Sequence, residues 1–256
     1  MDKFKILISP AKSMDFESKI DVEKATISLF LDQAKKINEV LKKKSPKKLM
    51  EFMGISDKLA ELNWTRNQAW TTLNTKGNSK QAIFAFTGDV YVGLDVNSLN
   101  QNQLEILQDK LRILSGLYGI LKPLDLIQPY RLEMGSALKI GTKKDLYQFW
   151  RKSVTSELNK ELTENDFLIN LASNEYFKVI DKKLLNVKSI ITPEFKDYKN
   201  GELKMIGFFA KKARGMMVRY IIENNINSIE GLKGFNSEGY AFDALLSSKQ
   251  KLVFTR

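Results

Sequence analysis

The 256 residues carry 41 lysines and arginines against 30 aspartates and glutamates, which gives a formal net charge of +11 at pH 7. Cysteine and histidine are both missing, which excludes disulfides, thiolate nucleophiles, iron–sulfur clusters, the usual zinc sites and Ser-His-Asp catalysis. Any chemistry must use carboxylates, lysine, tyrosine, hydroxyls or backbone amides. The positive excess favours an anionic partner such as nucleic acid, although it also serves solubility alone.

The length suits one domain, and we expect it to span residues 1–256 because no repeat or low-complexity linker divides the chain. Residues 1–5 lack the charged-then-apolar pattern of a secretion signal. No apolar run approaches the length that a bilayer requires. We therefore expect a cytoplasmic protein without membrane contact. We also expect it to be a monomer.

The first part of the chain predicts two strands among several helices. Residues 4–8 are an apolar run that a proline soon ends, which is typical of a buried strand, and residues 82–86 predict another. Apolar residues at helical spacing predict a helix over residues 25–44, and Ser56 is a suitable N-cap for a later one.

The middle of the chain predicts two helices and a strand. Ser98 and Gln101 fit a capping box. Asp145 begins another helix, and residues 167–171 predict a buried strand. The leucines that the first of these helices places on one face are Leu104, Leu107, Leu111 and Leu114.

The last part predicts a hairpin over residues 187–209, with Asn200-Gly201 as its turn, and then a helix over residues 210–224. Residues 251–254 predict a last edge strand. Strands and helices are interspersed without a clean βαβ order, so we predict an α+β fold with a mixed β-sheet and surrounding helices.

Lys12 lies in the segment that follows the first strand, between Ser9 and Ser13. Ligand sites in open sheets tend to lie at strand ends. A lysine between two serines at such a place can hold a phosphate. An ordinary surface turn is the alternative.

Residues 111–122 have the outline of a helix-hairpin-helix, in which a helix ends at a bend flanked by glycines. In that motif backbone amides contact a DNA phosphate, and the glycines let the backbone approach closely. A helix end leading into a buried strand is the alternative, and residues 229–235 are a weaker second candidate. The residues that we expect to contact DNA here are Arg112, Ser115, Gly116, Tyr118, Gly119 and Lys122.

The segment over residues 122–135 is long, and its apolar residues follow neither helical nor strand spacing. Long ordered loops of this kind are often functional. In it, Tyr130 could stack on a base and Arg131 could pair with a phosphate. A structural contact between Arg131 and Glu133 is the alternative.

Short polar residues follow the strand predicted over 167–171. Ser173 is suited to capping the next helix. Glu175 is one of few carboxylates near a strand end, and it is our first choice for a general base if the protein is an enzyme. Glu133 and Asp89 are the other candidates.

The helix predicted from residue 210 carries a basic stripe interrupted by Gly215. A glycine there weakens the helix by about 1 kcal/mol relative to alanine, but it would let a phosphate backbone lie close to the helix. We favour this anion contact over the alternative that Gly215 packs against another element. The basic residues of the helix are Lys211, Lys212, Arg214 and Arg219.

Motifs spread along the chain resemble the YaaA family of peroxide stress proteins. The longest is QPYRLEMG at residues 128–135, and SPAK at residues 9–12 is the first. The resemblance covers nearly the whole chain. Its other blocks are residues 88–91, 114–119, 123–126, 145–150, 170–173, 210–215 and 234–240.

The resemblance implies a bacterial cytosolic protein of the peroxide-stress response, which limits damage to DNA and protein when hydrogen peroxide meets intracellular iron. It also implies an unusual α+β fold that binds DNA through a positively charged cleft and a helix-hairpin-helix, which maps onto residues 111–122. We therefore expect binding of double-stranded or distorted DNA rather than catalysis, with no cofactor and no metal. The alternatives are an enzyme that acts on a nucleic-acid base or nucleotide, with a carboxylate as acid/base, and an iron-sequestering protein.

Overall fold

A computed structural model describes residues 3–256, and its centre is a mixed sheet of eight strands. The strand order is β12-β13-β10-β9-β1-β6-β7, and β11 pairs with β10. Five neighbouring strands are parallel, namely β13 (Lys251–Thr255), β10 (Ser189–Lys199), β9 (Phe167–Asn170), β1 (Phe4–Ile8) and β6 (Leu111–Ser115). The antiparallel strands are β7 (Gly119–Leu121), β11 (Glu202–Lys204) and β12 (Ala241–Asp243).

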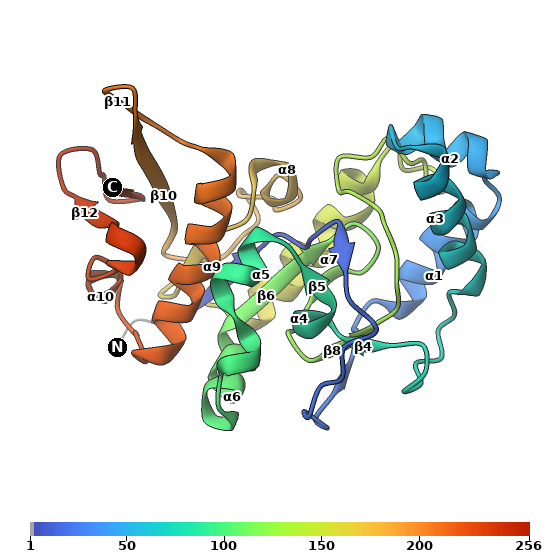
Figure 1. Cartoon of the computed structure of the whole chain (residues 1–256), viewed down its shortest axis with the longest axis horizontal. Helices are drawn as coiled ribbons and strands as arrows, with labels where there is room; N and C mark the ends of the chain where they lie inside the picture. Colours follow the sequence, from blue (N-terminus) through green and yellow to red (C-terminus); the bar gives the residue numbers. More distant parts are fainter. Residues whose placement is uncertain (1–2) are drawn as a thin grey trace.

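The helices surround this sheet, and two small sheets flank it (Figure 1). One small sheet pairs β2 (Ser13–Met14) with β5 (Phe86–Thr87), and the other joins β3 (Thr26–Ile27), β8 (Asp125–Ile127) and β4 (Lys80–Gln81). In Figure 1, α1 (Leu31–Lys42), α2 (Pro46–Met53) and α3 (Asp57–Ala69) lie together at one end of the molecule. The remaining helices are α4 (Ala82–Ala85), α5 (Asp89–Leu94), α6 (Gln101–Lys110), α7 (Leu146–Glu161), α8 (Asn174–Phe177), α9 (Gly207–Glu223) and α10 (Ile229–Leu232), with 3₁₀ turns at η1 (Val96–Ser98) and η2 (Ser237–Gly239).

Side-chain caps set several of the helix starts. The Ser56 hydroxyl accepts a hydrogen bond from the Leu59 amide at the start of α3, and Asp145 and Ser173 cap α7 and α8 in the same way. These three caps confirm their predictions. The capping box of α6 uses Asn100 with Gln103 rather than the predicted pair.

The structure confirms a mixed sheet with surrounding helices, together with the strands predicted over residues 4–8 and 167–171. The predicted hairpin turn is also present, with φ of 55° at Asn200 and 80° at Gly201, as a tight turn of mirror-image type requires. Its second arm is short, because residues 207–209 already belong to α9.

Three local predictions are wrong. The apolar run over residues 82–86 forms mainly the helix α4, because a fully buried apolar stretch has no periodicity that separates helix from strand. Residues 251–254 lie inside the sheet, between β10 and β12, rather than at its edge. Residues 111–121 form the antiparallel pair β6–β7 and not a helix-hairpin-helix, because Ile113 pairs with both β1 and β7. The second candidate, residues 229–235, contains the one-turn helix α10.

The order of the central strands indicates where a ligand site is expected. The chain passes from β1 to β6 on one side of β1, and later returns to β9 on the other side. The loops that leave β1 and β9 therefore begin side by side at the carboxyl ends of the strands. Such a switch in strand order is where open parallel sheets bind their ligands. Among residues 3–256, no helix combines the length and apolar character needed to span a membrane.

Candidate functional site

The carboxyl ends of β1 and β9 are joined by hydroxyl groups. The Ser9 hydroxyl accepts a hydrogen bond from the Ser173 amide at 2.9 Å and lies 3.3 Å from the Ser173 hydroxyl. The Tyr91 hydroxyl, from α5, donates to the Ser9 carbonyl oxygen at 3.1 Å. Three segments that are distant in sequence thus meet at this edge of the sheet.

Charged side chains gather beside these hydroxyls. Glu133 Oε1 accepts a hydrogen bond from Arg131 Nη2 at 3.0 Å and lies 3.3 Å from Lys12 Nζ. The side chain of Lys12 is 68% exposed, whereas those of Arg131 and Glu133 are 15% and 16% exposed. The segment that contains Lys12 and the segment over residues 122–135 therefore lie together, and the structural contact between Arg131 and Glu133 is present within the second of these segments.

A second arginine, which no sequence pattern distinguished, lies near Arg131. Arg66 comes from the last turn of α3, and its guanidinium donates to Asn63 Oδ1 at 3.4 Å. Burial lowers the pKa of Arg66, and the positive charge of Arg131 lowers this pKa further. Arg131 Nε is buried without a hydrogen-bond partner.

Glu175 completes the group of charged residues. Its carboxylate accepts a hydrogen bond from the Gly135 amide at 3.0 Å, and its carbonyl oxygen accepts one from the Tyr147 hydroxyl at 2.9 Å. Asp89, the third candidate for an acid/base, lies in the first turn of α5 and is partly exposed. We call Ser9, Lys12, Arg66, Arg131, Glu133 and Glu175 the strand-end cluster.

Three tyrosines line the interior side of the strand-end cluster. Burial raises the pKa of Tyr91, Tyr130 and Tyr176. Neighbouring tyrosines raise the pKa values of Tyr91 and Tyr130 further, and neighbouring glutamates raise that of Tyr176. The tyrosines therefore stay protonated and can donate hydrogen bonds. Tyr130 is only 5% exposed and its hydroxyl is 2.7 Å from that of Ser115, so it cannot stack on a base without rearrangement.

Most residues of the β6–β7 hairpin that we expected at a DNA interface lie in the interior. Arg112 is 4% exposed and forms a 2.7 Å ion pair with Glu161. The hydroxyl of the buried Tyr118 accepts hydrogen bonds from Trp70 Nε1 at 2.8 Å and from the Gln128 amide at 3.1 Å. These side chains hold the hairpin in the core. Lys122, just beyond β7, is exposed.

The two glycines of this hairpin serve packing. A Cβ atom on Gly116 would stand 2.2 Å from the Leu132 carbonyl oxygen, so only glycine lets the 128–135 segment pass. Gly119 has a φ of +74° and packs against the Trp150 ring, where a Cβ would be 2.7 Å away. In this structure neither glycine is available to a phosphate backbone, which corrects our expectation.

Most of the basic residues of α9 interact with carboxylates or carbonyl oxygens of the same chain. Lys212 pairs with Glu238, and Arg219 pairs with Glu223 at 2.6 Å while donating to the Asp95 carbonyl oxygen at 2.9 Å. Burial lowers the pKa of the partly buried Arg214, and Glu194 counteracts this shift. Lys211 remains exposed.

Gly215 likewise has a structural role. A Cβ atom at this position would stand 1.8 Å from the Val90 carbonyl oxygen of α5. The glycine faces another helix and not solvent, so a phosphate backbone cannot lie against it, and the alternative that Gly215 packs against another element is right.

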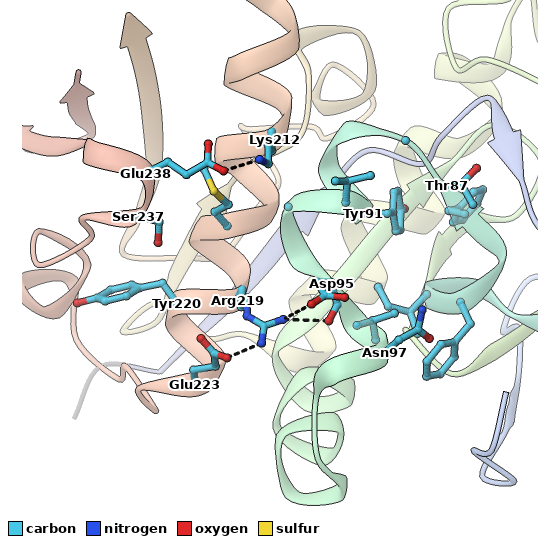
Figure 2. A pocket seen from close by; sticks show the side chains of 18 of the residues that line it. Thr87, Tyr91, Asp95, Asn97, Lys212, Arg219, Tyr220, Glu223, Ser237 and Glu238 are labelled. Carbon is cyan, nitrogen blue, oxygen red and sulfur yellow. Dashed lines mark hydrogen bonds and ion pairs between the residues drawn. The ribbon is translucent and has the colours of Figure 1, made fainter.

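A cleft with a volume of about 1060 Å³ lies between α5, α9 and the segment around Glu238, and Figure 2 shows it from close by. Lys212 and Arg219 lie on its wall, but both point to carboxylates, as the dashed lines in Figure 2 show. The charged residues of the lining are two cations and four carboxylates: Lys212, Arg219, Asp15, Asp95, Glu223 and Glu238. This cleft is therefore poorly suited to a polyanion.

The strand-end cluster is the better candidate site. It joins segments 9–12, 128–135 and 173–175 with Arg66, and it offers positive charge, protonated tyrosines and two carboxylates. Within residues 3–256, no group of three or more aspartates and glutamates is arranged to hold a metal ion.

Comparison with known proteins agrees with the sequence motifs. The family model of the peroxide stress protein YaaA matches residues 4–246. UPF0246 proteins of Flavobacterium psychrophilum and Flavobacterium johnsoniae are 60% and 58% identical to this chain over 252 residues, which is 98% of this chain and the full length of both relatives. A UPF0246 protein of Shewanella pealeana is 51% identical over 253 residues, covering 98% of each chain. The chain therefore belongs to the YaaA family of peroxide stress proteins.

Proposed function

We propose that this peroxide stress protein acts in the cytoplasm by binding double-stranded or distorted DNA, and that it limits the damage that iron and hydrogen peroxide cause to DNA and protein. The observation that carries the proposal is the positive charge around the strand-end cluster, in a chain with a net charge of +11. DNA affinity rests mainly on neutralising phosphates with lysine and arginine.

Exposed lysines from distant segments extend the positive charge along this edge of the sheet. Lys12 leaves the end of β1 and is 68% exposed. Lys178 is exposed and lies with its Nζ 5.1 Å from the centre of the Tyr147 ring, whose hydroxyl bonds to Glu175. A backbone that crosses the cluster could contact both lysines. Contacts to phosphate carry no base information, so we expect weak sequence preference.

Fluorescence anisotropy of a labelled duplex, titrated at several salt concentrations, tests this function. We expect the logarithm of the affinity to fall linearly with the logarithm of salt concentration. The double substitution Lys12→Ala and Lys178→Ala should weaken binding and reduce the magnitude of that slope by about 2. If the duplex does not bind, or if salt leaves the affinity unchanged, the proposal is wrong.

The matched control is Lys3→Ala with Lys249→Ala. Both lysines are exposed and precede β1 and β13, so they lie at the opposite, amino edge of the parallel strands. This variant loses the same charge from the other side of the sheet. Equal losses of affinity in the two double variants would indicate a response to net charge without a defined interface.

A second candidate function is an enzyme that acts on a nucleic-acid base or nucleotide. The specific observation in its favour is that Glu133 and Glu175 share the strand-end cluster with the protonated tyrosines. A carboxylate can act as the acid/base of such a reaction. Incubation with damaged oligonucleotides separates the functions, because Glu175→Gln should abolish turnover but retain binding only if the protein is an enzyme.

A further inference from the structure

The strand-end cluster holds more positive charge than its own carboxylates balance. Arg66, Arg131 and Lys12 contribute three positive charges, and Glu133 Oε1 is shared between Arg131 and Lys12. Within residues 3–256, no carboxylate oxygen lies within 4.0 Å of the Arg66 guanidinium. Glu175 adds a second negative charge to the cluster, but its carboxylate is held by the Gly135 amide and forms no ion pair within residues 3–256.

Two features of the arginines indicate a missing partner. Arg66 lies one turn before Trp70, and the Thr71 amide donates to the Gln128 side chain, so the end of α3 holds Arg66 beside the segment that carries Arg131. Burial lowers the pKa of Arg66, and the charge of Arg131 lowers it further, as expected for two like charges that the fold holds near each other. Arg131 Nε is buried and has no hydrogen-bond partner. A buried charged donor without a partner is costly. An anion between the two guanidinium groups would remove both costs.

The charges and the limited access favour a small, strongly charged anion. Three cations against the carboxylates Glu133 and Glu175 leave a net charge of +1 (3 − 2), which attracts a phosphate monoester with its charge of roughly −1.5 to −2 at pH 7. A guanidinium group can bind a phosphate through two parallel N–H···O hydrogen bonds. The side chain of Arg131 is 15% exposed, so a compact terminal group can reach it more easily than the backbone of a duplex.

We propose that the strand-end cluster is a binding site for a phosphate dianion, with Arg66 and Arg131 as its paired ligands and Lys12 at its opening. The dianion is either free phosphate or the terminal phosphate of a nucleotide or nucleic-acid end. The site lies at the switch point between β1, β6 and β9, where open parallel sheets bind ligands. This inference goes beyond duplex binding, which needs only phosphodiesters and exposed lysines.

Isothermal titration calorimetry of the full chain tests the site. The ligands are inorganic phosphate, adenosine 5′-monophosphate, and a single-stranded oligonucleotide that carries either a 5′-phosphate or a 5′-hydroxyl. Chloride at matched ionic strength is the salt control. Binding of inorganic phosphate alone would identify free phosphate as the ligand. Tighter binding of the nucleotide, or of the phosphorylated over the hydroxyl oligonucleotide, would identify a terminal phosphate. If none of the phosphates binds more tightly than chloride, the proposal is wrong.

Arg66→Gln provides the decisive variant. It should lower phosphate affinity by about tenfold or more, since hydrogen bonds to charged groups contribute about 1.5–3 kcal/mol. It should also raise the unfolding temperature in phosphate-free buffer, because it removes the repulsion with Arg131. Arg151→Gln, which removes an exposed arginine from α7, is the control and should leave phosphate affinity unchanged.

The two readouts separate a ligand-binding role from a purely structural one. If Arg66 had only a structural role, its replacement would lower the unfolding temperature. Added phosphate would then raise the unfolding temperature of the variant by as much as it raises that of the wild type. Loss of stability in Arg66→Gln with an unchanged response to phosphate would therefore overturn the proposal. Duplex binding that persists in Arg66→Gln leaves the DNA-binding function intact, so the two proposals fail separately.

Discussion

Gly215 on α9 lies directly against Val90 on α5, with room for no side-chain atom between the glycine and the Val90 carbonyl oxygen. The contact is reciprocal, because a Cβ atom on Gly93 of α5 would stand 2.1 Å from the Lys212 carbonyl oxygen of α9. The two helix backbones therefore touch. This packing sets the position of Tyr91, and through its hydroxyl it supports the end of β1.

Gly215→Ala should destabilise the protein, because the added methyl group would have to displace the backbone of α5. Overpacking of this kind typically costs about 1–3 kcal/mol. Urea unfolding, followed by circular dichroism, measures the change. Gly207→Ala, in the first turn of the same helix, is the matched control because nothing lies within 4 Å of its Cβ position. Equal unfolding midpoints for the two variants would contradict the packing role.

Arg112→Ala should destabilise the protein through its buried ion pair. It leaves the carboxylate of Glu161, 15% exposed, without its closest partner, and breaking a buried pair from one side costs about 3–5 kcal/mol. Chemical unfolding measures the loss. Lys122→Ala, at the exposed end of the same hairpin, should change stability little. If Arg112→Ala unfolds at the wild-type midpoint but binds DNA poorly, Arg112 is an interface residue after all.

The sequence predicted the frame of the fold better than its details. Strong apolar runs and capping residues identified β1, β9, α3 and α7, because these depend on local pattern alone. The helix-hairpin-helix failed because a glycine-flanked bend looks the same between two helices as between two strands. Only pairing with β1, about a hundred residues away in sequence, decides that residues 111–115 are a strand.

The candidate site was also predicted in part. Lys12, Arg131, Glu133 and Glu175 were chosen because they follow strands or lie in a long loop, and the sheet brings them together. Arg66 was missed because it is one charged residue in a polar helix, and only the packing of α3 against the 128–135 region gives it a role. The α9 stripe was misjudged because the sequence does not show which cations have carboxylate partners.

Tyr118→Phe should leave two buried donors without an acceptor. Trp70 Nε1 and the Gln128 amide both donate to the Tyr118 hydroxyl, and each unsatisfied buried group costs about 1–3 kcal/mol. We expect a destabilisation of about 2 kcal/mol or more by urea unfolding. Tyr198→Phe, at a tyrosine that is 66% exposed, should have no measurable effect. If Tyr118→Phe were as stable as the wild type, these hydrogen bonds would contribute nothing to the free energy of unfolding.

Glu238→Gln should lower the free energy of unfolding near neutral pH but not in acid. The hydrogen bond from Lys212 lowers the pKa of Glu238, and Arg256 lowers it further while burial opposes the shift. A carboxylate with a lowered pKa in the folded state stabilises the protein above its unfolded pKa, near 4.5, and loses this contribution as the pH falls through the folded pKa. Because the Glu238 side chain is 40% exposed, solvent screening limits the effect to about 0.5–1 kcal/mol at pH 7.

Urea unfolding of the wild type and of Glu238→Gln at pH 7 and pH 3 measures this dependence. The difference in unfolding free energy should be present at pH 7 and should be smaller at pH 3, because the contribution of the carboxylate is lost as the pH falls from 4.5 through the lower pKa of the folded state. Glu51→Gln, at an exposed glutamate of α2, controls for general charge effects. A difference of the same size at both pH values would mean that Glu238 acts through packing rather than through its charge, because a side chain's shape does not change with pH.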